Sequence, residues 1–271
     1  MENINDKIKK FAETLGKKPR EGKPSDYKSL RKIYDMQANE DVRRLQRDAK
    51  KQRIASLHGR SDLNPKWVFD TLEMDSDDAV DAISIAKSFI AAHDDPNWRQ
   101  SAAHMMIFYG DYGRGKSHIA GAIAHELIDT YEITVLYRQL SSLLEMRQSS
   151  FDFSAQDSAG EKFRHISQEL LEVDLLILDE VCVNESVLKK HSQSWLGNLL
   201  RQRLVNKKNC ILITNHSLRE LEAALGSYCF ESIKEYDTYK VHFQGPSRRK
   251  TIEDDFQPTN YKPKYVPNQV K

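Results

Sequence analysis

Apolar runs alternate with amphipathic stretches along most of the chain from residue 76 onward. Five apolar runs have the length and composition of buried strands: residues 104–109, 133–137, 173–179, 210–214 and 239–243. Apolar positions at helical spacing predict helices over residues 77–93, 116–131, 141–148, 161–171, 194–205 and 218–225. This alternation predicts an α/β fold in which a parallel sheet is flanked by helices.

The N-terminal part of the chain differs in character from this core. Residues 1–54 are rich in lysine and arginine, with a short helix expected over residues 4–15 and a long charged helix expected over residues 26–54. Tyr27, Leu30 and Tyr34 would form an apolar stripe on that helix. The basic face can be a solvated surface, or it can dock on a protein partner or a phosphate backbone.

These changes in composition divide the chain into four segments. They are a small basic helical module (1–54), a linker (55–75), the α/β domain (76–252) and a flexible C-terminal tail (253–271). The linker carries large apolar side chains, Trp67, Phe69 and Leu72, just ahead of the domain. They can flank an adenine ring or pack on the core.

Residues 110–117, Gly-Asp-Tyr-Gly-Arg-Gly-Lys-Ser, fit the G-x-x-x-x-G-K-[ST] pattern of a phosphate-binding loop. A predicted strand precedes the loop and a predicted helix follows it, as this pattern requires; a glycine-rich turn before an ordinary helix is the competing interpretation. Lys116 would reach the β- and γ-phosphates of ATP, and the Ser117 hydroxyl would ligate Mg²⁺. The predicted nucleotide-binding residues are Gly110, Asp111, Tyr112, Gly113, Arg114, Gly115, Lys116, Ser117 and His118.

A second predicted strand ends in two acids. Residues 173–179 form an apolar run that closes on Asp179 and is followed by Glu180. At the carboxyl end of such a strand, Asp179 would hold Mg²⁺ directly or through water. Glu180, one residue further, would polarise an attacking water molecule.

Composition narrows the class of protein. The chain of 271 residues has 41 basic and 40 acidic side chains, so any affinity for nucleic acid must come from local patches. Three cysteines without metal-type spacing indicate reduced thiols of a cytoplasmic protein, and the histidines show no zinc-type arrangement. No apolar run is long enough to cross a bilayer, so no membrane partner is expected.

Asn215 follows the apolar run 210–214, beyond both nucleotide motifs. In AAA+ ATPases a polar residue at this position, sensor 1, orients the attacking water. Taken in order, the motifs resemble those of the DnaC-type bacterial helicase loaders over about residues 55–250. The residues that carry this resemblance are Leu57-His58, Phe69, residues 110–118, residues 174–180, Thr214-Asn215, Leu225-Gly226, residues 241–243 and Ser247-Arg248-Arg249.

The resemblance implies an AAA+ ATPase domain and a set of partners. The family's N-terminal module grips the replicative DNA helicase, and its members assemble in the helicase complex. Arg249 falls where the family keeps the sensor 2 arginine, and Arg248 is the adjacent alternative. Phe151 matches the aromatic that stacks on single-stranded DNA, with Arg147 near it for phosphates, although Phe151 and Phe153 can also be loop anchors that pack on the core.

One position departs from the family pattern. Where the family supplies an arginine finger to a neighbouring subunit, this chain has Ser232, and Lys234 lies two residues further on. A serine cannot stabilise charge on a γ-phosphate, and lysine lacks the guanidinium fork. The expected activity is therefore weak ATP hydrolysis.

Three other functions remain open at this stage. An ATPase helper of a transposition system shares the same AAA+ domain and acts on duplex DNA. A non-hydrolysing adaptor would use ATP only to stabilise a shape, as Ser232 favours. A small-molecule kinase would need a mobile arginine-rich lid and would have no use for Asn215.

Overall fold

The computed structural model describes residues 13–14, 27–72, 76–151, 158–182 and 187–248. The chain divides into two compact units, Met1–Lys51 and Gln52–Lys271. Most of the helix expected near the N-terminus, over residues 4–15, lies outside the described residues, as do Phe153, Arg249 and the predicted tail. No described helix combines the length and apolar character needed to span a membrane.

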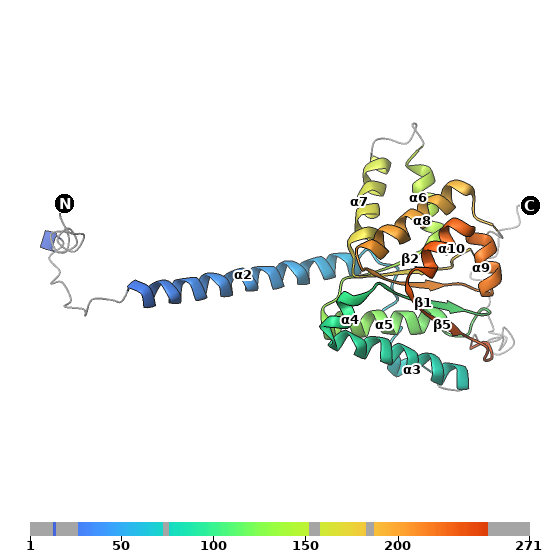
Figure 1. Cartoon of the computed structure of the whole chain (residues 1–271), viewed down its shortest axis with the longest axis horizontal. Coiled ribbons are helices and arrows are strands. Elements are labelled where there is room, and N and C mark those ends of the chain that lie inside the picture. The colour runs from blue at the N-terminus through green and yellow to red at the C-terminus, as the bar shows by residue number, and fades with distance from the viewer. Residues whose placement is uncertain (1–12, 15–26, 73–75, 152–157, 183–186, 249–271) are drawn as a thin grey trace, which may run out of the picture. The chain divides into compact units, whose positions relative to one another are not determined.

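The second unit is built on a five-stranded sheet in the order β2-β3-β4-β1-β5 (Figure 1). All neighbouring strands pair in parallel. The predicted α/β fold is confirmed, although β2 begins two residues later than the sequence pattern suggests. The strands are β1 His104–Tyr109, β2 Val135–Gln139, β3 Leu175–Asp179, β4 Asn209–Ile213 and β5 Asp237–His242.

Helices cover both faces of this sheet (Figure 1). One core lies between the sheet and α3 (Asp77–Ala91) with α5 (Lys116–Tyr131). The second core lies under the remaining large helices, which are α6 Leu140–Ser149, α7 Ser158–Glu172, α8 Lys190–Val205, α9 Leu218–Leu225 and α10 Ser227–Lys234.

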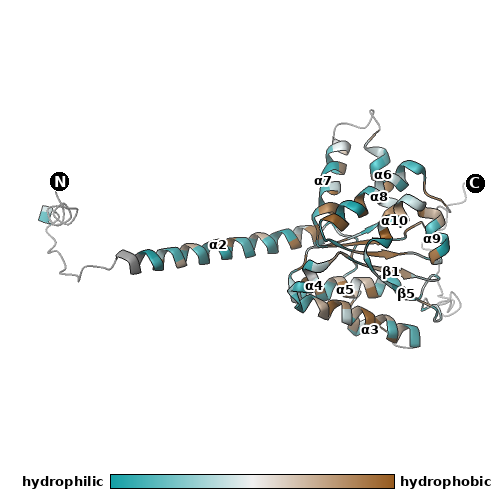
Figure 2. Ribbon diagram, viewed as in Figure 1, coloured by the Kyte–Doolittle hydropathy of each residue, from teal (hydrophilic) through white to brown (hydrophobic). Residues whose placement is uncertain are grey.

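The inner strands β1, β3 and β4 are largely buried on both faces, as parallel strands between two helical layers must be (Figure 2). The edge strand β5 is mostly polar and buries only Val241. Met105 and Ile107 of β1 join one core, and the alternate residues Met106 and Phe108 join the other. Short helical pieces complete the described fold: η1 Phe69–Thr71, η2 Ala92–Asp94 and α4 Pro96–Ser101.

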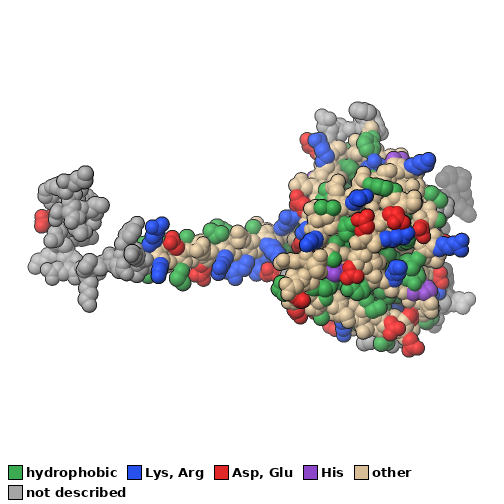
Figure 3. Space-filling model, in the orientation of Figure 1, with side chains coloured by type: hydrophobic (Ala, Val, Ile, Leu, Met, Phe, Trp, Pro, Cys, Tyr) green, Lys and Arg blue, Asp and Glu red, His purple; other side chains and the backbone are tan. Residues whose placement is uncertain are grey.

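Helix α2 spans Tyr27–His58 and ends four residues beyond its expected end. Every side chain from residue 31 to residue 53 is exposed, and Lys and Arg side chains are spread along the helix (Figure 3). Leu57, in the last turn, is buried in the core of the second unit, and Arg53 pairs with Glu172 there at 2.7 Å. The end of α2 therefore belongs structurally to the α/β unit.

A buried arginine ties three elements of the second unit together. Arg203 of α8 has no exposed surface. Its Nη1 donates to the carbonyls of Leu170 at 2.6 Å and Val173 at 3.0 Å, and its Nη2 donates to the Asn209 carbonyl at 2.6 Å. The guanidinium thus joins the last turn of α7 to the strand starts of β3 and β4, where a positive charge suits the helix C-terminus.

Replacing this guanidinium is expected to destabilise the fold. Arg203→Met should lower the free energy of unfolding by about 3 kcal/mol or more, since each buried acceptor left without a partner costs about 1–3 kcal/mol. Urea denaturation would measure the change. Arg201→Met, at an exposed position of the same helix, is the matched control, and equal midpoints for both variants would contradict this role.

Candidate nucleotide-binding site

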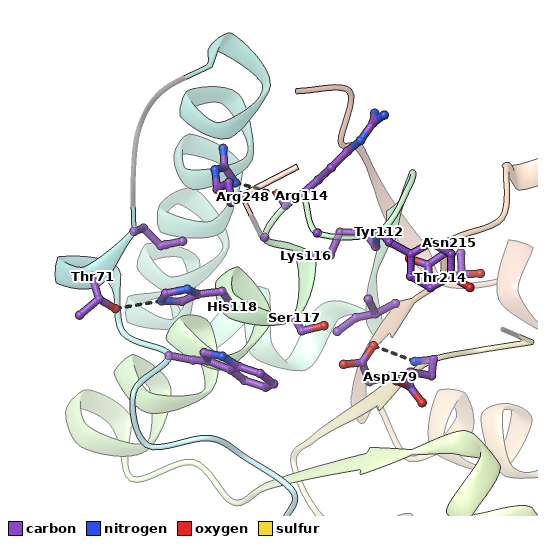
Figure 4. A pocket seen from close by; sticks show the side chains of 16 residues that line it. Thr71, Tyr112, Arg114, Lys116, Ser117, His118, Asp179, Thr214, Asn215 and Arg248 are labelled. Atoms are coloured by element: carbon purple, nitrogen blue, oxygen red, sulfur yellow. Dashed lines mark hydrogen bonds between the residues drawn. The ribbon is translucent and has the colours of Figure 1, made fainter. Parts of the chain in front are cut away.

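A cavity of about 570 Å³ opens at the carboxyl ends of β1, β3 and β4 (Figure 4). It brings together most of the predicted nucleotide residues from five separate parts of the chain. Its lining consists of Trp67, Thr71, Leu72, Tyr112, Gly113, Arg114, Gly115, Lys116, Ser117, His118, Asp179, Glu180, Ile213, Thr214, Asn215 and Arg248.

The loop between β1 and α5 depends on glycines at two close approaches. Gly110 has a φ of 126°, and a Cβ there would lie 2.2 Å from the Phe243 carbonyl oxygen. Gly115 has a φ of 90°, and a Cβ there would lie 2.5 Å from a guanidinium nitrogen of Arg248. No other residue fits these positions without displacing backbone or blocking Arg248. Helix α5 begins directly after the loop, so its N-terminal N–H groups and dipole favour an anion there.

Lys116 is largely buried at the start of α5. Its exposed fraction is 6%, and its Nζ donates to the carbonyls of Gly110 at 2.7 Å and Asp111 at 2.6 Å. Asp111 does not line the cavity, and its carboxylate pairs with Arg114. The ammonium group is therefore held against the loop, in a position from which it can reach a bound phosphate.

Asp179 lies at the end of β3 with both carboxylate oxygens engaged. Oδ1 accepts from the Glu180 N–H at 2.7 Å, and Oδ2 accepts from the Tyr137 hydroxyl. The carboxylate is 7% exposed and faces the cavity opposite Thr71 and His118 (Figure 4). Glu180 adopts a left-handed φ of 54°, a strained conformation that is typical of functional sites.

Tyr137 is a residue that the sequence pattern did not single out. It lies in β2, is 1% exposed, and contacts Asp179 and the Ser117 hydroxyl. Burial, the charge of Asp179 and the hydrogen bond to it raise the pKa of Tyr137, against the opposing hydrogen bond from Ser117. The phenol therefore stays protonated and acts as a donor. The apolar sequence of β2 does not indicate that its tyrosine side chain faces a site.

The loops after β3 and β4 are joined by several hydrogen bonds. The Thr214 hydroxyl donates to the Val181 carbonyl at 2.9 Å, and the Val181 N–H donates to the Ile213 carbonyl at 2.9 Å. His216 Nε2 lies 2.7 Å from the Cys182 carbonyl oxygen. Asn215 lines the cavity within this bonded pair of loops, together with Asp179 and Glu180.

Of the two arginines considered for sensor 2, Arg248 lies within the described residues and lines the cavity. Its N–H donates to the Gly113 carbonyl at 2.8 Å, and its guanidinium donates to the Arg114 carbonyl at 2.7 Å and to Ser76 Oγ at 3.1 Å. The segment after β5 is thereby attached to the phosphate loop. Arg249 remains a sequence-based expectation.

Asp78, near the start of α3, holds the same segment from the other side. Its Oδ2 accepts from the N–H groups of Gln244 at 2.8 Å and Gly245 at 2.9 Å. Burial alone would raise the pKa of Asp78, but the hydrogen bonds from Gly245, Ser76 and Gln244 and the charge of Arg248 outweigh it and lower that pKa. The ionised carboxylate thus fixes the chain just before Arg248.

The linker forms the side of the cavity opposite the acids. Trp67, Phe69 and Leu72 all pack against the core, and Trp67 and Leu72 also line the cavity. His118 Nε2 lies 2.9 Å from Thr71 Oγ1 and 3.2 Å from the Val68 carbonyl oxygen. Burial lowers the pKa of His118, the hydrogen bond to the Val68 carbonyl raises it, and the charge of Arg248 lowers it further, with a net lowering. A neutral ring beside Trp67 and Leu72 suits a planar, uncharged base.

Arg147 and Phe151 lie away from the nucleotide cavity, at the end of α6. The Phe151 ring is 64% exposed, so it is not a core anchor. The Arg147 guanidinium lies 5.1 Å from the centre of the Phe151 ring and 6.0 Å from that of Trp195. Of this group only the Phe151 ring is exposed, whereas Arg147 and Trp195 are half-buried. An exposed ring beside a cation can stack a base and contact a phosphate.

Ser232 and Lys234 belong to α10, a helix that the sequence pattern did not reveal because Gly226 separates it from α9 by a single residue. Ser232 is 2% exposed and its hydroxyl bonds to the Tyr228 carbonyl at 3.3 Å. Ser232 therefore does not face outward as an arginine finger would. Lys234 is exposed and pairs with Glu231 at 2.7 Å.

Comparison with known proteins agrees with this geometry. A family profile described as IstB-like ATP binding protein matches residues 7–233. The chain belongs to this ATP-binding family. The sequence motifs indicated a resemblance to the DnaC-type loaders. Relatives named replicative helicase loader DnaC confirm this resemblance.

Individual relatives are distant. The chain is 25% identical over 213 residues to the uncharacterized protein YdaV of Escherichia coli K12, covering 79% of this chain and 80% of that protein. It is 23% identical over 211 residues to the replicative helicase loader DnaC of the same organism, covering 78% and 80%. A crystal structure of the DnaC helicase loader shares the fold, with a TM-score of 0.55 at 18% identity over 67% of this chain and 100% of that one.

Removing the Lys116 ammonium is expected to weaken nucleotide binding. Charge-assisted hydrogen bonds contribute about 1.5–3 kcal/mol, so Lys116→Ala should raise the Kd for ATP by about 10- to 150-fold. Equilibrium binding of a fluorescent ATP analogue would measure this. Lys190→Ala removes an exposed lysine from α8 and is the control; if both variants bind as the wild type does, this cavity is not the nucleotide site.

Proposed function

We propose that this protein is an ATP-dependent loader that binds a replicative DNA helicase and helps to place it on single-stranded DNA. One observation carries the proposal: the phosphate loop, the acids after β3, Asn215 and Arg248 converge on a single cavity. Membership of an ATP-binding family and similarity to proteins named replicative helicase loader support it.

ATP would bind with its phosphates along the loop 110–117 and its base between the linker and His118. Lys116 would contact the β- and γ-phosphates, and the N–H groups at the start of α5 would face phosphate oxygens. Trp67 and Leu72 offer apolar surface on the base side.

Ser117 and Asp179 fit a magnesium ion, because Mg²⁺ prefers oxygen ligands and both side chains face the cavity. When bound, Mg²⁺ would neutralise charge that develops on the β- and γ-phosphates. Asp179 would contribute a carboxylate that is already oriented by two hydrogen bonds. Ser117 would contribute a hydroxyl group in the first turn of α5.

Hydrolysis would depend on Glu180, Asn215 and an arginine after β5. Glu180 would accept a proton from the attacking water, Asn215 would orient that water, and Arg248 or Arg249 would contact the γ-phosphate. An arginine supplied by a neighbouring subunit raises phosphoryl-transfer rates by about 10³–10⁵-fold. In this chain the corresponding position is occupied by Ser232, which is buried and has no positive charge. We therefore expect slow ATP turnover.

The helicase contact is assigned to α2. Tyr34, Val42 and Leu45 are exposed and, at 100° per residue, fall within an arc of about 80° on one side of the helix. Basic residues around them would steer the helix toward an acidic surface. The single-stranded DNA contact is assigned to Phe151 and Arg147, and several copies would assemble on the helicase.

A non-hydrolysing adaptor is the second candidate, and burial of Ser232 favours it. A protein of this kind would bind ATP without hydrolysing it, and the bound ATP would change its affinity for a partner protein. The two candidates differ in the expected effect of removing the Glu180 carboxylate.

Glu180→Gln is expected to keep ATP binding and lose turnover, because the amide cannot accept the proton from water. A steady-state ATPase assay, run together with nucleotide binding, would show the separation. Glu172→Gln, an acid on the surface of α7, is the control. A wild-type protein without turnover would favour the adaptor, and a fully active Glu180→Gln would refute the assignment of the base.

Single-stranded DNA binding is expected to require Phe151 and Arg147. Stacking contributes about 1–3 kcal/mol per base, so Phe151→Ala should weaken binding about 5- to 150-fold. Arg147→Ala should reduce the slope of log affinity against log salt by about 0.7. Anisotropy titrations of an oligonucleotide would measure both, with Tyr228→Ala and Arg201→Ala as controls at exposed positions. Unchanged DNA binding in both test variants would refute the assignment of the single-stranded DNA site to this surface.

Helicase capture is expected to require the exposed apolar residues Tyr34, Val42 and Leu45 on one side of α2. Full-length protein with Tyr34→Ser, Val42→Ser and Leu45→Ser should bind ATP normally and fail to bind the helicase, because apolar contact area is lost without a change in charge. Co-purification with the helicase of the source organism would test this. Ile33→Ser with Met36→Ser changes other faces of the same helix and is the control. Normal capture by the triple variant would refute the assignment.

A further inference from the structure

The side chain of Tyr137 reaches from the edge strand β2 to the predicted magnesium ligands. Tyr137 pairs with Ile177 in the register of β2 and β3, and Asp179 lies two residues further along β3. Side chains two residues apart on a strand point to the same face of the sheet. The phenol therefore meets the Asp179 carboxylate and donates to its Oδ2, and it lies near the Ser117 hydroxyl.

This arrangement leaves Asp179 with little freedom to rotate. One oxygen accepts from Tyr137 and the other accepts from the Glu180 N–H, and the side chain is 7% exposed. An ionised carboxylate has about four acceptor sites, so two hydrogen bonds leave sites on both oxygens for a cation. Tyr137 thus orients the carboxylate without using up its capacity as a ligand.

Tyr137 is in turn held by the linker that precedes the α/β domain. Its N–H donates to Ser61 Oγ at 2.9 Å, and its carbonyl accepts from the Asp62 N–H at 3.0 Å. The ring of Trp67 lies 5.5 Å from the Tyr137 ring, centre to centre. Backbone and ring are therefore both fixed by residues 61–67, and the hydroxyl has a single well-defined direction.

We propose that Tyr137 is a positioning residue that holds Asp179 in the geometry needed to bind magnesium together with ATP. The inference rests on the proposed function, since it concerns the same ATP site. It adds a residue from β2, outside the phosphate loop and the acidic strand, that acts on the metal ligands through its hydroxyl group. Hydrogen-bond partners of metal ligands typically change metal affinity by about 10- to 100-fold.

The hydroxyl can be removed with little effect on packing. Tyr137→Phe keeps the buried ring against Trp67 and deletes only the donor to Asp179. Tyr236→Phe is a matched control, because Tyr236 is also buried and its hydroxyl donates to the Leu200 carbonyl at 2.6 Å, in the core on the other side of the sheet. Both variants lose one buried phenolic hydroxyl, but only one of them changes the contacts of Asp179.

The experiment measures binding of a non-hydrolysable fluorescent ATP analogue to the full-length protein, first in EDTA and then as Mg²⁺ is added. For wild type, added Mg²⁺ should strengthen binding of the analogue. Tyr137→Phe should leave the affinity in EDTA unchanged and raise the Mg²⁺ concentration that gives half of the strengthening by about 10- to 100-fold. Tyr236→Phe should match wild type in both conditions.

Three results would overturn the inference. They are an unchanged Mg²⁺ requirement in Tyr137→Phe, an equal loss of affinity with and without Mg²⁺, and failure of Tyr137→Phe to fold when Tyr236→Phe folds. The second and third would make the phenol a structural support of the pocket. A wild-type protein that binds no nucleotide in either condition would instead refute the proposed function itself.

Discussion

The position of β1 between β4 and β5 is the constraint on which the candidate site depends. Because all five strands run parallel, their carboxyl ends lie at one edge of the sheet. The loop after β1 therefore meets Asn215 after β4 and Arg248 after β5, and Asp179 follows from β3 one strand further. Residues more than a hundred positions apart in the chain are brought to one cavity by strand order alone.

Backbone hydrogen bonds then join these loops into one unit. The Phe243 N–H donates to the Tyr109 carbonyl at 2.9 Å, the Arg248 N–H to Gly113, and the Val181 N–H to Ile213. Buried backbone groups need partners, so a shift of one loop would leave its neighbour unsatisfied. This mutual support explains how Glu180 can keep a left-handed conformation directly beside the predicted metal ligand.

The linker between α2 and the α/β domain has a structural role beyond connection. Ser61 and Asp62 bond to the backbone of Tyr137 on the edge strand, and Trp67 lies against its ring, while Thr71 meets His118 at the start of α5. The same short segment thus covers an open sheet edge and forms one wall of the nucleotide cavity. Just before this segment, Leu57 in the last turn of α2 is buried in the core of the same unit.

The local sequence pattern was sufficient to predict the fold and many of the residues that line the cavity. The loop 110–117, Asp179 with Glu180, and Asn215 could be recognised because each motif is contiguous and adjoins an apolar strand, which places it at a strand end. The order of the five strands, the approach of Arg248 to Gly115 and the contact of Tyr137 with Asp179 could not be recognised in this way. Each of these contacts joins segments that are distant in the sequence. In addition, the hydrophobic pattern of a buried strand does not indicate which of its residues faces a site. Helix α10 was missed for a related reason: Gly226 reads as the end of a helix, and burial of Ser232 against neighbouring helices is set by packing, not by the residues around it.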